Sequence, residues 1–126
     1  MRPQFVTKDM HAYLDYPVAL SLMAMPFLLG LGNSHSAALW LSVATGIAAF
    51  VLTLLTDHKL GAFRVLPYSL HLAIDFAVAI VFVAAPFAMG FYGLDLVYYL
   101  ANALAVFVVV SLHKPETDAV AVGMMG

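Results

Sequence analysis

The chain contains no cysteine, which excludes disulfide bonds, cysteine-based zinc and iron–sulfur sites, and thiol nucleophiles. Charged residues are also scarce, at 10% of the chain, whereas soluble domains carry about 25%. The five basic residues are outnumbered by seven acidic ones, for a formal net charge of −2. This balance offers no basic surface, so nucleic-acid binding is excluded as a main role.

Apolar residues dominate what is present. The chain has 126 residues, of which 64% are hydrophobic, and its mean hydropathy is +1.00. A soluble domain carries roughly 45–50% apolar residues, and one of this size could not bury such an excess. We therefore expect residues 1–126 to form a single membrane domain whose main partner is the lipid bilayer.

Four long apolar stretches follow one another, at residues 12–31, 37–55, 66–91 and 94–112. Each is close to the ~20 residues that a helix needs to cross a bilayer. The breaks between them are short and polar or glycine-rich, which favours antiparallel neighbours. The sequence thus predicts an all-α, polytopic membrane protein with four transmembrane helices arranged as two helical hairpins. Residues 114–126 are expected to form a flexible tail.

All five basic residues lie on one side of this predicted topology. Arg2 and Lys8 precede the first helix, Lys59 and Arg64 lie between the second and third, and Lys114 follows the fourth. The positive-inside rule then places both termini and the middle loop in the cytoplasm.

The two hairpins look like copies of each other. Shifting the chain by 60 residues aligns His11 with His71 and Asp15 with Asp75, and 8 of the 21 residues from 11 to 31 are identical in this register. We infer an internal duplication, with repeat one at 11–58 and repeat two at 71–113. Two-helix repeats insert in the same orientation, so a pseudo-two-fold axis along the membrane normal is expected.

The duplicated His and Asp residues are the strongest candidates for a functional site. The four-residue spacing puts His11 and Asp15 on one helix face, and does the same for His71 and Asp75. A carboxylate at membrane depth is costly and usually faces the bundle interior, where it finds a partner. The simplest interpretation is structural, with His11 bonding Asp75 and His71 bonding Asp15 across the repeats.

Two alternatives give the same residues a ligand. Imidazole and carboxylate suit a transition metal, and His11, Asp15, His71 and Asp75 would supply four ligands. His58 and His113, which end the second and fourth helices on the same side, are weaker candidates. A haem held by two histidines, or a quinone bonded by His and Asp, is less favoured because it needs a flat slot that the sequence cannot show.

Other residues suggest packing roles. Small residues on the second helix permit close helix contact, and Asn102 is expected to make an interhelical hydrogen bond. Tyrosine and tryptophan near the helix ends are expected to form two aromatic belts. One belt would hold Tyr13, Tyr16 and Tyr68, and the other Trp40, Tyr92, Tyr98 and Tyr99; the small residues are Ala44, Gly46, Ala48 and Ala49.

Three segments resemble the SPW-repeat integral membrane proteins: residues 11–16 (HAYLDY), 56–61 (TDHKLG) and 64–75 (RVLPYSLHLAID). The family is named for a Ser-Pro-Trp tripeptide, of which this chain keeps only the proline, as Pro26 and Pro86. The resemblance implies a duplicated two-helix unit and a bacterial inner-membrane location. It implies no established activity. The family pattern usually has tyrosine at the site of His58, which makes His58 a weaker ligand.

For function, we expect a non-enzymatic accessory or interaction subunit that packs in a homo-oligomer or a larger membrane complex. The sequence shows no nucleophile–base pair and no phosphate-binding loop, which argues against an enzyme. The alternative is a metal-, haem- or quinone-binding membrane protein that uses the four His and Asp residues.

Overall fold

The computed structural model describes residues 8–56, 63 and 65–112, apart from the side chains at positions 8, 9, 11 and 12. It contains four helices: α1 (Lys8–Leu28), α2 (Ala37–Leu55), α3 (Tyr68–Met89) and α4 (Gly93–Leu112). The predicted all-α class and the four helical stretches are therefore confirmed. The tail predicted at 114–126 lies outside the described residues.

Within the described residues, three helices are long and apolar enough to cross a membrane, namely α2, α3 and α4. The apolar part of α1 is shorter and runs from Tyr13 to Leu28. At 1.5 Å per residue this part is about 24 Å long, against a hydrocarbon layer of ~30 Å. The cause lies in the sequence, because the first turns of α1 contain Lys8, Asp9 and His11.

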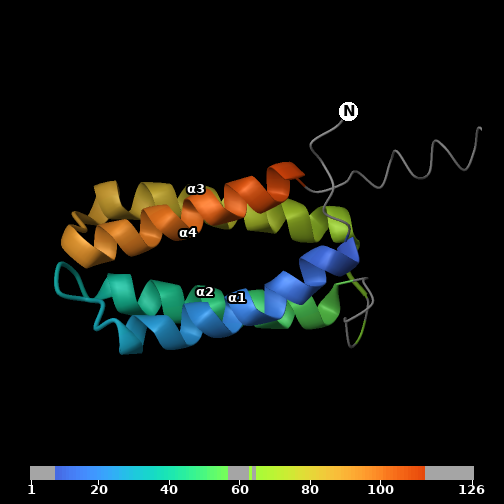
Figure 1. Cartoon of the computed structure of the whole chain (residues 1–126), viewed down its shortest axis with the longest axis horizontal. Coiled ribbons are helices and arrows are strands. Elements are labelled where there is room, and N and C mark those ends of the chain that lie inside the picture. Colours follow the sequence, from blue (N-terminus) through green and yellow to red (C-terminus); the bar gives the residue numbers. More distant parts are fainter. Residues whose placement is uncertain (1–7, 57–62, 64, 113–126) are drawn as a thin grey trace, which may run out of the picture.

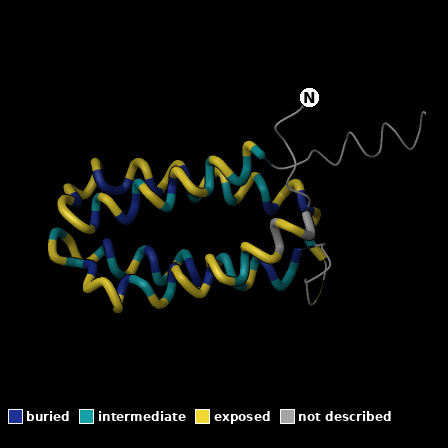
Figure 2. The backbone as a smooth tube through the Cα atoms, viewed as in Figure 1, coloured by how far each residue is buried: buried dark blue, intermediate teal, exposed yellow. Residues whose placement is uncertain are grey.

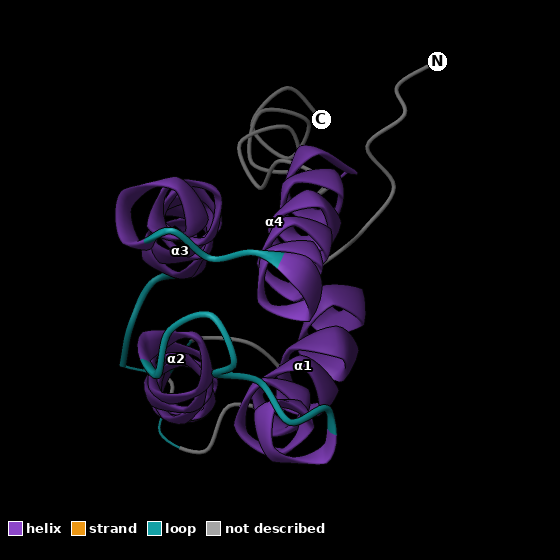
Figure 3. Cartoon of the chain, turned by 90° about the vertical axis from the view of Figure 1, so that its left-hand side faces the viewer, coloured by secondary structure: helices purple, strands orange, loops and turns teal. Residues whose placement is uncertain are grey.

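The helices form two antiparallel hairpins, α1 with α2 and α3 with α4, stacked as two layers (Figure 1). Viewed end-on, the four helices occupy four corners, and α1 lies diagonally opposite α3 (Figure 3). We call the end with loops 29–36 and 90–92 the turn end. The end where α1 begins and α4 stops is the terminal end.

Both hairpin turns use the same backbone device. Gly30 and Gly90 adopt positive φ angles of 65° and 73°, a conformation that glycine adopts without steric cost. The next amide in each turn donates back to a buried proline: Leu31 N–H to Pro26 O at 2.9 Å, and Phe91 N–H to Pro86 O at 2.8 Å. The chain thus leaves α1 and α3 in the same way, at positions 60 residues apart.

The buried core lies toward the turn end, where Leu31, Phe91 and Tyr99 join one hydrophobic cluster with Leu22 and Phe82. Much of the remaining apolar surface faces outward along all four helices (Figure 2). Such a distribution is expected where lipid or another subunit, and not water, surrounds a bundle.

Gly46 allows α1 and α2 to pack closely. A Cβ atom at this position would come within 2.7 Å of Met23 Cγ and 2.8 Å of Ala19 O. One of these contacts is backbone, so it could not be relieved by rotating a side chain. The small residue at position 46 therefore serves contact within the chain, while Ala44 and Ala48 are exposed.

The expected aromatic belts are only partly present. Trp40, Tyr92 and Tyr13 are exposed as a belt requires, at 60%, 64% and 60%. Tyr68, Tyr98 and Tyr99 are instead buried, and their assignment to the belts was wrong. Tyr99 donates to Ala38 O at 2.7 Å and Tyr98 pairs with Ser42 at 2.7 Å, because a buried phenol needs a hydrogen-bond partner.

Candidate functional site

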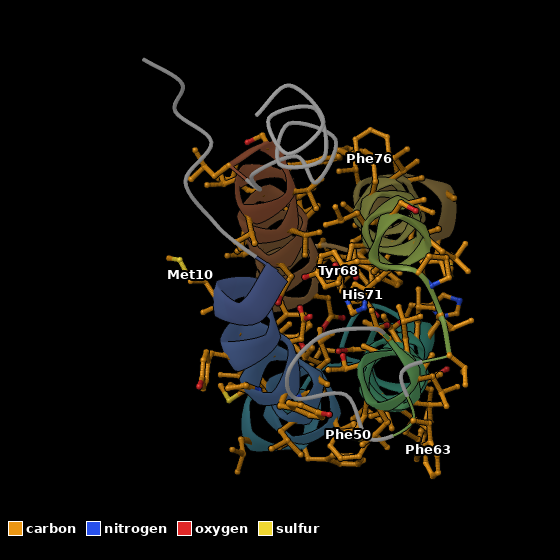
Figure 4. The ribbon with its side chains drawn as sticks, turned by 90° about the vertical axis from the view of Figure 1, so that its right-hand side faces the viewer. Met10, Phe50, Phe63, Tyr68, His71 and Phe76 are labelled. Atoms are coloured by element: carbon orange, nitrogen blue, oxygen red, sulfur yellow. The ribbon has the colours of Figure 1, made fainter. Side chains whose placement is uncertain are left out.

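His71 lies at the centre of the terminal end. It is in the first turn of α3, which starts after the extended Pro67, and it is only 1% exposed. The Tyr68 ring stacks on the imidazole, with centroids 5.2 Å apart and an interplanar angle of 4°. Figure 4 shows these two side chains in the interior between the helices, whereas Met10 and Phe76 point outward. α3 thus holds the imidazole in a fixed orientation.

Two carboxylates share one nitrogen of this imidazole. His71 Nε2 lies 3.2 Å from Asp15 Oδ2 of α1 and 3.2 Å from Asp75 Oδ2, one turn along α3. We call Asp15, His71 and Asp75 the His/Asp cluster. It joins α1 to α3, helices that lie diagonally opposite in the bundle, and so connects the two hairpins. The expected contact between His71 and Asp15 is therefore confirmed.

The other imidazole nitrogen contacts α2. Thr56, the C-cap of α2, is completely buried and its Oγ1 lies 2.8 Å from His71 Nδ1. The same hydroxyl lies 2.6 Å from Leu52 O. Because the Thr56 hydroxyl donates its single proton to Leu52 O, the Thr56–His71 bond is donated by Nδ1–H, and Nε2 also carries a proton to bond the carboxylate oxygens, which only accept. His71 thus joins three helices through its two nitrogens.

The His/Asp cluster also has the arrangement of a partial metal site. One ligand atom from each of its three residues lies within 4.8 Å of the others. Two ligands at 2.0–2.2 Å from a tetrahedral metal are roughly 3.4 Å apart, close to the observed 3.2 Å from Nε2 to each Oδ2. A metal would replace the proton on Nε2, because a coordinating imidazole nitrogen must be free of its proton. Hydrogen bonding and metal binding therefore compete for the same three atoms.

The remaining predicted ligands are not placed by the structure. His11 belongs to α1, but its side chain lies outside the described part, so the expected His11–Asp75 contact stays a prediction. His58 and His113 also lie outside the described residues. The structure thus brings together three of the four main candidates, Asp15, His71 and Asp75.

A cavity of about 550 Å³ opens from the His/Asp cluster into the space between the hairpins. Side chains from all four helices line it, mostly Val, Leu, Ile and Ala. Thr45 and Asn102 add polar groups further from the cluster. Asn102 donates to Tyr98 O of its own helix at 2.8 Å, so the interhelical bond expected for it was wrong. Its position four residues after Tyr98 puts its amide within reach of that carbonyl.

Asp95 forms a second polar link, at the turn end. This residue of α4 is 2% exposed. Its carboxylate accepts from Gly32 N–H and Ser34 N–H, both at 2.9 Å, and from the Ser34 hydroxyl. α4 is thereby attached to the loop between α1 and α2. The two hairpins are joined by polar contacts at both ends, with the cavity in the terminal half.

Sequence reasoning missed Thr56, Tyr68 and Asp95. Thr56 falls in a segment that looks like a polar break, although a threonine that ends a membrane helix is able to face the interior. Asp95 lies in the first turn of α4, two residues after Gly93, where acidic residues are common because they stabilise a helix N-terminus. An intramembrane carboxylate with no basic neighbour in sequence was the available signal for its burial.

Comparison of the chain with family models, curated proteins and solved structures found no match.

Proposed function

We propose that this chain is a small, non-enzymatic membrane subunit of the SPW-repeat type, whose His/Asp cluster holds its two hairpins together. The observation that carries this proposal is the position of His71, which bonds Asp15 of the other hairpin and Thr56 at the end of α2. An intramembrane polar cluster that joins helices has a structural task that needs no reaction. The duplicated geometry of the two turns supports the internal repeat and its pseudo-two-fold axis.

Exposed aromatic side chains at the turn end support an interaction role. Phe27 and Trp40 are 56% and 60% exposed and pack edge to face, with centroids 6.0 Å apart. Aromatic residues are enriched at protein–protein interfaces. The pair belongs to the α1–α2 hairpin, next to its turn, and would contact a second copy or a larger complex.

The number of subunits tests this interaction role. In nanodiscs, we expect native mass spectrometry to show assemblies larger than one copy, or one copy with a second protein from the source membrane. Trp40→Ala should lower the assembled fraction, because it removes the larger ring of the exposed pair. Tyr92→Ala, at an equally exposed site of the other hairpin, is the control. A single copy under all conditions would contradict the proposal.

We also propose a multi-pass location in a bacterial inner membrane, with all four helices spanning and both termini cytoplasmic. The support is the placement of every Lys and Arg at or before the start of α1, between α2 and α3, or after α4, together with the positive-inside rule.

Cysteine labelling tests this orientation on the natural cysteine-free background. Phe63→Cys lies at a 69% exposed position between α2 and α3 and should react only with reagent on the cytoplasmic side. Asn33→Cys, exposed in the opposite loop, should react only from outside. The reverse pattern, or both cysteines reacting from one side, would refute the proposed four-span topology.

A metal-binding function is the second candidate, favoured by the 3.2 Å spacing within the His/Asp cluster. After chelator treatment, zinc should raise the Tm of the wild type, because a ligand that binds the folded state stabilises it. Asp75→Asn should abolish this shift by removing a charged ligand, and Mg²⁺ should produce none. If zinc leaves the wild-type Tm unchanged, the cluster is a hydrogen-bonded link and the metal-binding function is wrong.

A further inference from the structure

The cavity beside the His/Asp cluster has the size and chemistry of a ligand site. Its volume of about 550 Å³ lies within the ~300–1,000 Å³ of small-molecule pockets. Such pockets combine an apolar lining with a few polar groups that fix orientation. Here Asp15, His71 and Asp75 supply the polar groups at the terminal end, and mostly aliphatic side chains line the rest.

The lining favours a flexible chain over a flat ring. Apart from the His71 imidazole, none of the described lining side chains is aromatic, so a haem or quinone ring would find no stacking partner. Val78, Val106 and Val109, from two helices, are typical of the walls. Such branched aliphatic surfaces fit a hydrocarbon chain, which gains its binding free energy from burial alone.

The His/Asp cluster determines which head group a ligand with such a hydrocarbon chain can carry. Carboxylate oxygens only accept hydrogen bonds, and each has two lone pairs, so a carboxylate such as that of Asp15 or Asp75 accepts several donors at once. Their side chains remain partly accessible, at 11% and 20% exposure. A head that donates hydrogen bonds is stabilised there, whereas a carboxylate or phosphate head is repelled by the two acids.

We propose that the cavity binds a lipid-soluble, single-chain amphipath whose aliphatic tail lies between the hairpins and whose amine or hydroxyl head donates to Asp15 and Asp75. The site goes beyond the subunit role proposed above, since it requires only one copy of the chain. It also gives a reason for the hollow terminal half in a bundle whose core is packed at the turn end.

Competition among three probes of equal chain length tests this site. The full chain in dimyristoylphosphatidylcholine nanodiscs would be mixed with hexadecylamine, hexadecanol and hexadecanoate in equal amounts. Native mass spectrometry would then count the probe retained. We expect the amine and the alcohol to be retained about tenfold more than the carboxylate, the ratio expected for one charge-assisted hydrogen bond.

Two matched valine substitutions on α4 test the location. Val106 lines the cavity, and Val106→Phe should reduce retention of hexadecylamine about tenfold by filling it. Val108 lies two residues away, is 45% exposed and is not part of the lining, so Val108→Phe should retain the wild-type amount. Asp75→Asn should lower the ratio of retained hexadecylamine to retained hexadecanoate, while hexadecanol should still be retained.

Equal retention of the three probes would overturn the proposal, because it would indicate nonspecific occupation by any bilayer chain. Equal loss in Val106→Phe and Val108→Phe would overturn it as well. If Val106→Phe fails to fold, the head-group preference of the wild type still decides. The same spectra separate this proposal from the subunit role, since probe retention is read on each copy and assembly on the number of copies.

Discussion

His71→Ala should lower the free energy of unfolding by about 3 kcal/mol. This is the loss expected when one partner of a buried ion pair is removed and the carboxylates that faced it remain. The imidazole bonds Asp15, Asp75 and Thr56, so its removal deprives two carboxylates of a shared donor. It also removes the ring that stacks on Tyr68. Denaturant unfolding in detergent micelles would measure the loss.

Three further variants separate charge from volume. His71→Phe keeps an aromatic ring beside Tyr68 but cannot donate, so it should be nearly as unstable as His71→Ala. Asp15→Asn should cost less, about 0.6–1.7 kcal/mol, as for other interhelical polar bonds in membranes. Adding Asp75→Asn to His71→Ala should recover stability, because one of the two facing carboxylates is removed. If the two changes instead add, the cluster is not held together by the shared imidazole.

The fold was predictable to the extent that hydropathy determines it. The apolar stretches at 37–55 and 94–112 coincide with α2 and α4 to within one residue. The start of α1 was predicted less well: the helix begins at Lys8, four residues before the apolar stretch, since a helix continues beyond its apolar part where polar residues favour it. Gly30 and Gly90 marked both turns correctly, because positive φ strongly favours glycine.

The residues of the site were predictable where helix spacing or the internal repeat determined their position. Asp75 and His71 are four residues apart, so helix geometry alone places them together. Asp15 could be predicted from the internal repeat, because it aligns with Asp75 and was expected to face the same interior. Thr56 did not follow from any local rule, as its contact with His71 depends on where α2 ends relative to α3. The cavity could not be predicted either, because it results from the separation of two hairpins whose facing residues are mostly apolar.

The positions of the polar links suggest how the two hairpins are held. At the turn end, Asp95 and the tyrosines of α4 bond α2 and its preceding loop, and the core packs around them. At the terminal end the His/Asp cluster is a link that lies beside a cavity and not beside packed core. Among the described residues, the polar link of the terminal half therefore has less packed core around it than that of the turn half. Loss of His71 should loosen the terminal half first, which hydrogen exchange at α3 amides would detect.

Asp95→Ala should lower the free energy of unfolding by about 3 kcal/mol, because it leaves three donors in loop 29–36 without their charged acceptor. The donors are the Gly32 amide, the Ser34 amide and the Ser34 hydroxyl. Each bond to a charged group is worth roughly 1.5–3 kcal/mol, but loop 29–36 is partly exposed, so water will replace part of the total. Thermal unfolding in the same micelles would measure the loss.

Two matched variants, Ser34→Ala and Asp95→Asn, test whether the carboxylate of Asp95 is responsible for the loss in Asp95→Ala. Ser34→Ala removes only the hydroxyl bond and should cost about 1 kcal/mol. Asp95→Asn keeps an acceptor for Gly32 N–H, but its amide group would face the two donors of Ser34, so its cost should lie between those of the other variants. Ser34→Ala matching Asp95→Ala would contradict this role. In that case the loop would be held by the hydroxyl, and the carboxylate of Asp95 would not be the link between α4 and the first hairpin.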